Sequence, residues 1–202
     1  MTDRQFLRGL SGGVSVLALA GFFWLGVGLG VPAANAGWLV FGISTAFQFG
    51  ACLGLLIFAA RLRRRSGFKP SELRNGDADQ RNEIRRIRAG FLWTTLGETL
   101  LIGMGVWWCV RASRQQLMWP WMSLIVSLHL VPLARLFNVR VYYVTGLAGS
   151  IISLVAIIGL RIPHNLAYLG GSMAAIMWLS AAYLVWNADD ITSKAVSEPW
   201  AV

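Results

Sequence analysis

The segment LMWPWMSLIVSLHLVPLARLF (residues 117–137) decides the fold class of this chain. Its side chains are apolar or small apart from His129 and Arg135. It is long enough to cross the ~30 Å hydrocarbon core of a bilayer as a helix that rises ~1.5 Å per residue. Backbone groups in lipid have no water to bond, so such a segment must be helical. We therefore expect residues 117–137 to form a transmembrane helix.

Five further apolar runs, each of about 20 residues, surround this segment. Of the 202 residues, 56% are hydrophobic and 13% are charged, whereas a soluble domain is about one quarter charged. The sequence thus predicts an all-α, polytopic transmembrane bundle of about six helices, forming one domain over residues 1–202. The expected helices are residues 10–31, 38–60, 91–110, 117–137, 141–160 and 166–186, with a basic loop at residues 61–90.

The basic residues give the expected orientation. With the N-terminus inside, 15 of the 18 Lys and Arg residues fall in inside segments, ten of them in loop 61–90. Cytoplasmic loops carry this excess of positive charge. Both termini are therefore predicted to be cytoplasmic, in a bacterial-type inner membrane. In the same loop, Asp77 or Asp79 can cap a helix, so we expect the third helix to begin before residue 91 as a stem at the membrane surface.

The first apolar run has a second interpretation, a cleaved signal peptide. Two Arg residues precede the run, and Ala34-Asn35-Ala36 resembles a signal-peptidase site. The apolar stretch is longer than the roughly 7–15 residues that signal peptides use, which favours a retained helix. Cleavage would leave five helices in the same orientation.

Two ionisable residues lie deep in the predicted helices, Glu98 and His129. Such residues are costly in lipid and are functional candidates for that reason. Glu98 lies ~15 Å along its helix from Arg88, and His129 lies ~9 Å before Arg135. On antiparallel neighbouring helices the two side chains would reach similar depths. We expect them to meet or share a water and to hold one mobile proton, as membrane proton relays do. The alternative is a packing role, with polar contacts worth ~0.6 kcal/mol each.

Pro132 and three polar residues extend this candidate site. Pro132 cannot donate to the carbonyl of Leu128, so we expect a kink next to His129. Arg135 is expected either to extend to the cytoplasmic interface or to turn inward as an anion ligand. Gln48 and Tyr142 lie on polar stripes of their helices and are expected to face the same space.

The net charge of +9 follows from membrane orientation, which disfavours nucleic acid as a partner. The cluster Arg61, Arg63, Arg64 and Arg65 would attract anionic lipid headgroups, at ~1 kcal/mol per residue, although control of membrane topology is the favoured explanation of this charge. A homo-oligomer is the alternative partner, although we expect close helix contacts to form mainly within one bundle. Small residues four apart allow close helix contact, as at Gly26 with Gly30, Gly50 with Gly54, Gly146 with Ser150 and Gly170 with Ala174.

Several functional classes are disfavoured by missing motifs. The chain has no Walker loop, dinucleotide-binding glycine loop, nucleophile elbow or HExxH motif,. Its two cysteines and two histidines have no metal-binding spacing. We therefore expect no enzyme, no catalytic residue, no cofactor and no metal. Two functions remain: a small-solute transporter or permease with a Glu/His proton site, and a non-transport membrane protein such as an assembly, sensory or lipid-interacting factor. An enzyme acting on lipid ranks below both.

The segment HLVPLARLF (residues 129–137), followed by YYVTG (residues 142–146), resembles a signature of small multi-pass bacterial membrane proteins of unknown function. The resemblance covers about 18 residues. It implies a multi-pass membrane fold in which the His, Pro, Arg and Tyr-Tyr positions form one unit, and it implies no substrate.

Overall fold

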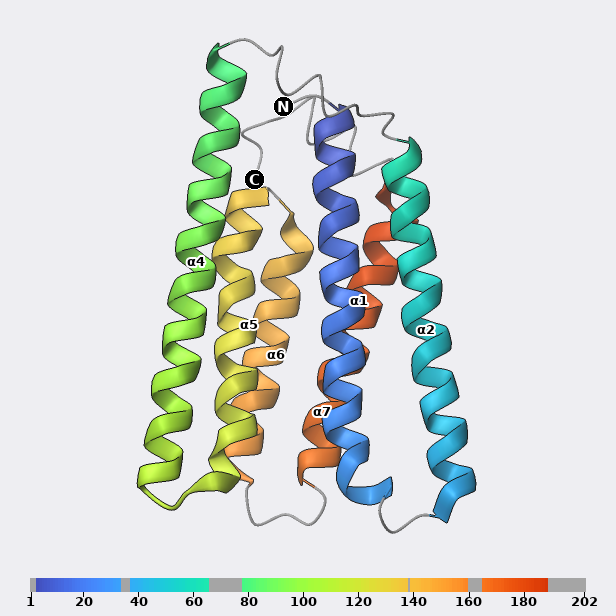
Figure 1. The fold of residues 1–202 in the computed structure, drawn as a ribbon, viewed down its shortest axis with the longest axis vertical. Coiled ribbons are helices and arrows are strands. Elements are labelled where there is room, and N and C mark those ends of the chain that lie inside the picture. Colours follow the sequence, from blue (N-terminus) through green and yellow to red (C-terminus); the bar gives the residue numbers. More distant parts are fainter. Residues whose placement is uncertain (1–2, 34–36, 66–77, 138, 160–164, 189–202) are drawn as a thin grey trace.

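The computed structural model describes residues 3–33, 37–65, 78–137, 139–159 and 165–188, and these residues form six α-helices and no strand. Successive helices run up and down in alternation (Figure 1). A single 3-10 turn, η1 (Gln115–Leu117), precedes the fourth helix. The helices are α1 (Asp3–Ala33), α2 (Gly37–Arg65), α4 (Ala78–Arg111), α5 (Met118–Phe137), α6 (Arg140–Ile158) and α7 (Asn165–Trp186).

The predicted all-α fold of about six helices is confirmed. Each predicted run overlaps one observed helix, and four of the six predicted starts lie within one residue of the observed start. The predicted early start of the third helix is also found, because α4 begins at Ala78 instead of residue 91. The stem carries Arg85 and Arg86 as exposed side chains.

Five of the helices contain stretches that are long and apolar enough to cross a membrane. In α2 the apolar stretch with described side chains, Thr45–Arg61, is shorter. Large apolar side chains cover the outside of the bundle, which in water would be a severe aggregation liability but suits contact with lipid. Five of these residues are each 64–73% exposed: Phe47, Trp93, Leu100, Val144 and Leu179. These observations place the chain among multi-pass membrane proteins.

The helices are arranged as an arc, in the order α4, α5, α6, α7, α1, α2. Each helix makes extensive contacts with the next one in this order, and the two outer helices, α4 and α2, lie on opposite sides of the molecule (Figure 1). The core centres on α7, whose buried face meets α1. It includes Trp24 of α1 and Met173 and Met177 of α7, each at most 1% exposed.

Helices α1 and α7 cross closely in the core at two glycines. A Cβ atom added to Gly170 would lie 2.5 Å from the Cα atom of Gly28 and 2.5 Å from the carbonyl oxygen of Trp24. The two backbones therefore touch, which small residues permit in membrane helices.

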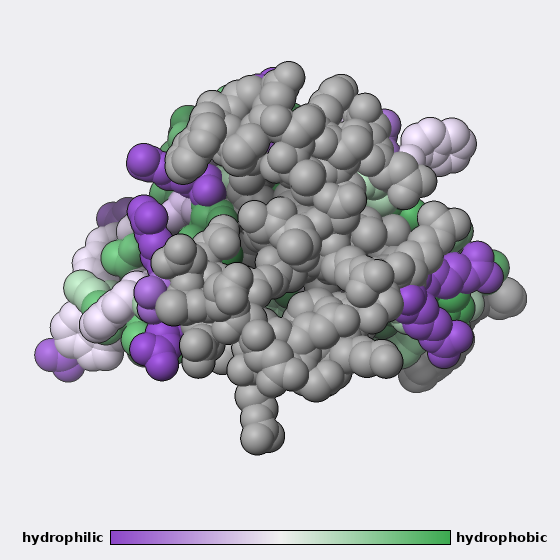
Figure 2. All heavy atoms as spheres, turned by 90° about the horizontal axis from the view of Figure 1, so that it is seen from above, coloured by the Kyte–Doolittle hydropathy of each residue, from purple (hydrophilic) through white to green (hydrophobic). Residues whose placement is uncertain are grey.

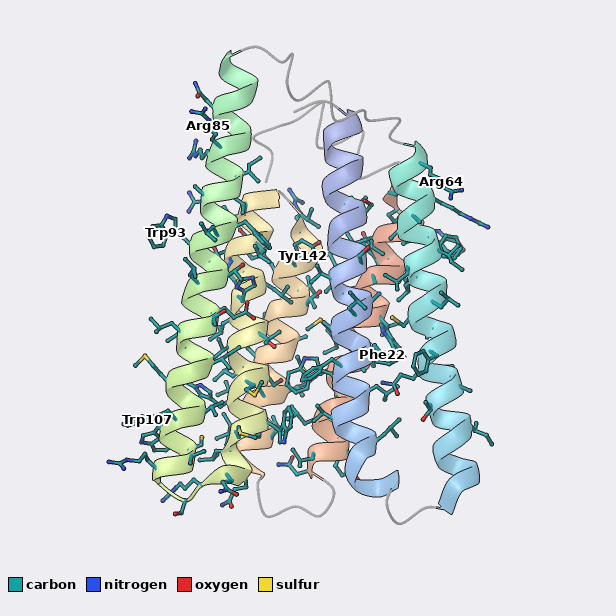
Figure 3. The ribbon with its side chains drawn as sticks, viewed as in Figure 1. Phe22, Arg64, Arg85, Trp93, Trp107 and Tyr142 are labelled. Atoms are coloured by element: carbon teal, nitrogen blue, oxygen red, sulfur yellow. The ribbon has the colours of Figure 1, made fainter. Side chains whose placement is uncertain are left out.

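One end of the bundle collects the start of α1, the end of α2, the start of α4 and the end of α7 (Figure 1). Arg64 and Arg85 lie at this end (Figure 3). Figure 2 looks onto it and shows hydrophilic side chains on the α4 and α2 flanks. Among the described helices, the first thus starts and the last finishes on the same side of the bundle, as expected for six helices that alternate in direction (Figure 1).

Candidate functional site

The α4–α5 hairpin sets the depth of every side chain at the candidate site. Ser113, with φ 54°, turns the chain after α4 through the left-handed region, which non-glycine residues seldom adopt. The turn is short, so α4 and α5 pack as antiparallel neighbours. Near one end of the hairpin Trp121 Nε1 donates to the carbonyl of Leu101 at 3.2 Å. Near the other end, Leu136 lies against Gly90.

Glu98 and His129 meet between these two contacts. Their Oε2 and Nδ1 atoms are 3.2 Å apart, and the side chains are 19% and 10% exposed, respectively. The juxtaposition expected from depth along the two helices is therefore present in the structure. Apolar side chains of α4, including Trp93 and Leu100, cover the outer face of the same helix.

The Glu98–His129 contact is close without being an aligned hydrogen bond. Nδ1 has no hydrogen-bond partner although it is buried, so the 3.2 Å separation reflects proximity only. If Nδ1 lacks a proton, an imidazole lone pair faces a carboxylate lone pair, and the two repel unless Glu98 is protonated. If both ring nitrogens are protonated, the pair is an ion pair. In either arrangement one proton between the two groups is the favourable number.

Three threonines of α4 lie within four residues of Glu98 in the sequence, and one of them differs from the other two in its hydrogen bonding. The hydroxyl of Thr94 donates to the carbonyl of Gly90 at 2.7 Å, and that of Thr99 donates to the carbonyl of Thr95 at 2.9 Å. Both hydroxyls donate to the carbonyl four residues earlier, as threonine side chains in helices commonly do. The hydroxyl of Thr95 is buried and has no hydrogen-bond partner. The sequence alone does not distinguish Thr95 from Thr94 and Thr99.

The other predicted site residues lie elsewhere. Gln48 is buried between α2 and α1, where its Nε2 donates to the carbonyl of Phe22 at 2.5 Å. Tyr142 is 4% exposed, and its hydroxyl lies against Gly13 of α1 (Figure 3). Arg135 is exposed. The structure therefore brings together Glu98 and His129 and leaves Gln48 and Tyr142 at contacts with α1.

Pro132 lies within α5, which stays α-helical from Met118 to Phe137. Proline has no N–H, so the carbonyl of Leu128 loses the bond that residue 132 would otherwise donate. A carbonyl without its helical donor thus sits one residue before His129, and the kink expected there stays a prediction.

Hydrogen bonds between other helices explain further polar side chains. Ser123 of α5 and Ser153 of α6 pair at 2.7 Å between their hydroxyl oxygens. Thr145 of α6 and Ser180 of α7 pair at 2.6 Å. Such bonds hold membrane helices together, and they account for the polar stripe on α6 without any ligand.

Two basic residues near the end of α2, Arg61 and Arg64, have described side chains. Arg61 lies over the ring of Phe58, with 5.6 Å from its guanidinium carbon to the ring centroid, and Arg64 is exposed. The side chains of Arg63 and Arg65 lie outside the described residues. Within the described ranges no three His, Cys, Asp or Glu residues form a group that could hold a metal ion.

Comparisons with family models, curated proteins and solved structures give no match to this chain.

Proposed function

We propose that this protein is an inner-membrane transporter of a small solute, driven by a proton held between Glu98 and His129. We also propose that it crosses the membrane six times with both termini cytoplasmic. The observation that supports transport is the 3.2 Å contact between Glu98 Oε2 and His129 Nδ1, mostly shielded between two helices with apolar outer faces. An ionisable pair at membrane depth is a functional candidate because lipid makes it costly.

The position of this pair gives the proton a mechanical role. Among the described residues, α4 makes its extensive helix contacts with α5, and the pair lies in that contact. Loss of the shared proton leaves a carboxylate beside a neutral imidazole, so the ion-pair attraction is lost and a net negative charge remains in the interface. Protonation would therefore change how tightly α4 docks on the bundle, which is the kind of two-state element that alternating access needs.

The first test is infrared difference titration of the purified protein against Glu98→Gln and His129→Ala. We expect a carboxyl band that titrates between roughly pH 4 and 9, around the unperturbed carboxyl and histidine values. The band should be absent in Glu98→Gln and shifted in His129→Ala. Circular dichroism should show that both variants keep their helices.

The second test addresses transport itself. Proteoliposomes on a solid-supported membrane are exposed in turn to amino acids, sugars, organic acids and inorganic cations at fixed pH. A charge displacement in the wild type that Glu98→Gln lacks would support proton-coupled transport. A protein without a titrating carboxyl band and with no solute-evoked current would contradict it.

A lipid-interacting factor is the second candidate, and a separate observation favours it. Exposed Arg61, Arg64, Arg85 and Arg86 occupy one end of the bundle, on α2 and α4. Each would contribute ~1 kcal/mol to binding of anionic headgroups. Native mass spectrometry of the wild type and of Arg61→Gln/Arg64→Gln, after extraction from membranes, checks this. Equal retention of phosphatidylglycerol by both proteins would argue against the lipid role.

A further inference from the structure

Thr95 is the residue whose position the packing of the bundle does not explain. Its neighbours Thr94 and Thr99 satisfy their hydroxyls on carbonyls of the preceding turn, at 2.7 and 2.9 Å. The hydroxyl of Thr95 is buried and lacks a partner. A buried hydroxyl left unpaired is costly, so the exception calls for a group that satisfies it.

A second buried polar atom without a partner lies at the same interface. His129 is 10% exposed, and its Nδ1 has no hydrogen-bond partner. Thr95 precedes Glu98 by three residues, which places the two side chains as neighbours on one face of α4. Two unpartnered polar atoms therefore flank one carboxylate.

Pro132 adds an acceptor at the same depth. Gly90 lies against Leu136 and Glu98 against His129. Thr95 lies between Gly90 and Glu98 along α4, so it reaches the same depth as Pro132 on α5. There the carbonyl of Leu128 has lost its helical donor. Carbonyls freed by proline in membrane helices are commonly satisfied by side chains or ordered water.

This set of groups matches what one water molecule needs. A buried water makes about three hydrogen bonds, and it does so to groups that the protein leaves unsatisfied. Water can donate to Glu98 and to an unprotonated Nδ1, and it can accept from Thr95. A sodium ion fits less well, because an imidazole nitrogen is a poor ligand for a hard cation, which prefers oxygen.

We propose that Thr95, Glu98 and His129 hold one water molecule between α4 and α5, and that this water relays the proton of the site. The relay rests on the proposed proton function, whereas the bound water does not. In the relay the water accepts a proton from the imidazolium Nδ1 and gives one to the Glu98 carboxylate. One proton moves, the water is unchanged, and Thr95 acts as a positioning residue.

The test compares Thr95→Val with two matched controls, Thr94→Val and Thr99→Val. All three variants replace a hydroxyl by a methyl group of similar shape on the same helix. Infrared difference spectra are recorded in ordinary and heavy-oxygen water, because only a band of bound water shifts between them. Thermal unfolding and the titration midpoint of the Glu98 carboxyl band are measured on the same samples.

We expect the isotope-sensitive water band to be lost in Thr95→Val and retained in both controls. The titration midpoint of the Glu98 carboxyl band should shift to higher pH in Thr95→Val alone. The shift follows because the carboxylate loses a hydrogen-bond donor when the water leaves. Unfolding of Thr95→Val at the wild-type temperature or above, with the water band retained, would overturn the proposal, since removal of an idle buried hydroxyl is neutral or stabilising.

Two further outcomes separate this inference from the proposed function. If no carboxyl band titrates in the wild type, the proton function fails, and the water band with its dependence on Thr95 still decides whether the water is bound. Replacing choline by sodium should leave the midpoint unchanged. A sodium-dependent shift would overturn the proposal, because a cation would then occupy the position assigned to water.

Discussion

Replacing Gly170 by alanine tests the α1–α7 crossing on which the core depends. The new Cβ atom would lie 2.5 Å from the Cα atom of Gly28 and from the carbonyl oxygen of Trp24, whereas ordinary contact begins at 3.4 Å. Both neighbours are backbone atoms and cannot rotate away. The helices must therefore separate by about 1 Å along the crossing, and overpacking of this kind costs ~1–3 kcal/mol.

Gly171→Ala is the matched control, because a Cβ atom there meets nothing within 4 Å. It is the next residue of the same helix, so both variants gain the same helix propensity of up to ~1 kcal/mol. Gly28→Ala, whose nearest atoms lie at 3.0–3.2 Å, should fall between the two. Unfolding in detergent, followed by tryptophan fluorescence, measures the order. Equal stability of Gly170→Ala and Gly171→Ala would refute the close crossing.

Three further predictions follow from other contacts. Gly105→Ala should displace the indole of Trp121, which lies over that glycine. The stability of the α4–α5 hairpin should then fall by ~1–3 kcal/mol in the same unfolding assay. An unchanged unfolding midpoint would contradict the contact. Gln48→Leu should cost ~0.6 kcal/mol, the mean for an interhelical hydrogen bond, because it removes the bond to α1,; a loss of transport current with unchanged stability would instead place Gln48 in the transport pathway. Arg114 lies in the turn after α4, at the end of the bundle opposite Arg64 (Figure 3). In a cysteine-free background, an impermeant maleimide should label Arg114→Cys in intact cells and Arg64→Cys only after lysis; the reverse pattern would invert the proposed orientation.

The sequence predicts the helices well because bilayer thickness fixes their length. Apolar runs of about 20 residues leave little freedom in where the apolar part of a helix lies. Four of the six observed starts follow these runs, whereas α1 and α4 begin earlier, at Asp3 and Ala78. The meeting of Glu98 with His129 is predictable for a related reason. The two helices are joined by a short turn, so distance along each helix determines depth in the membrane.

Neighbour relations around the bundle are not predictable in this way. The sequence predicts Gln48 near Glu98, yet it bonds to α1, because depth in the membrane does not determine which helices lie side by side. The spacing of small residues has the same weakness. Gly50 and Gly54 have nothing within 4 Å of an added Cβ atom, whereas Gly28, which belongs to no predicted pair, forms the close crossing. Spacing identifies a face and leaves its partner undetermined.

The extensive pairing of α1 with α7 has a consequence for biosynthesis. These are the first and the last described helices, and Trp24 is buried by the time both are in place. About 150 residues separate the end of α1 from the end of α7, so at 5–20 residues per second the ribosome needs roughly 8–30 s to deliver the partner of α1. During that interval the glycine-lined surface of α1 faces lipid or the insertion machinery. A chain truncated before α7 would keep that surface uncovered, and a membrane quality-control protease would have a segment by which to recognise it.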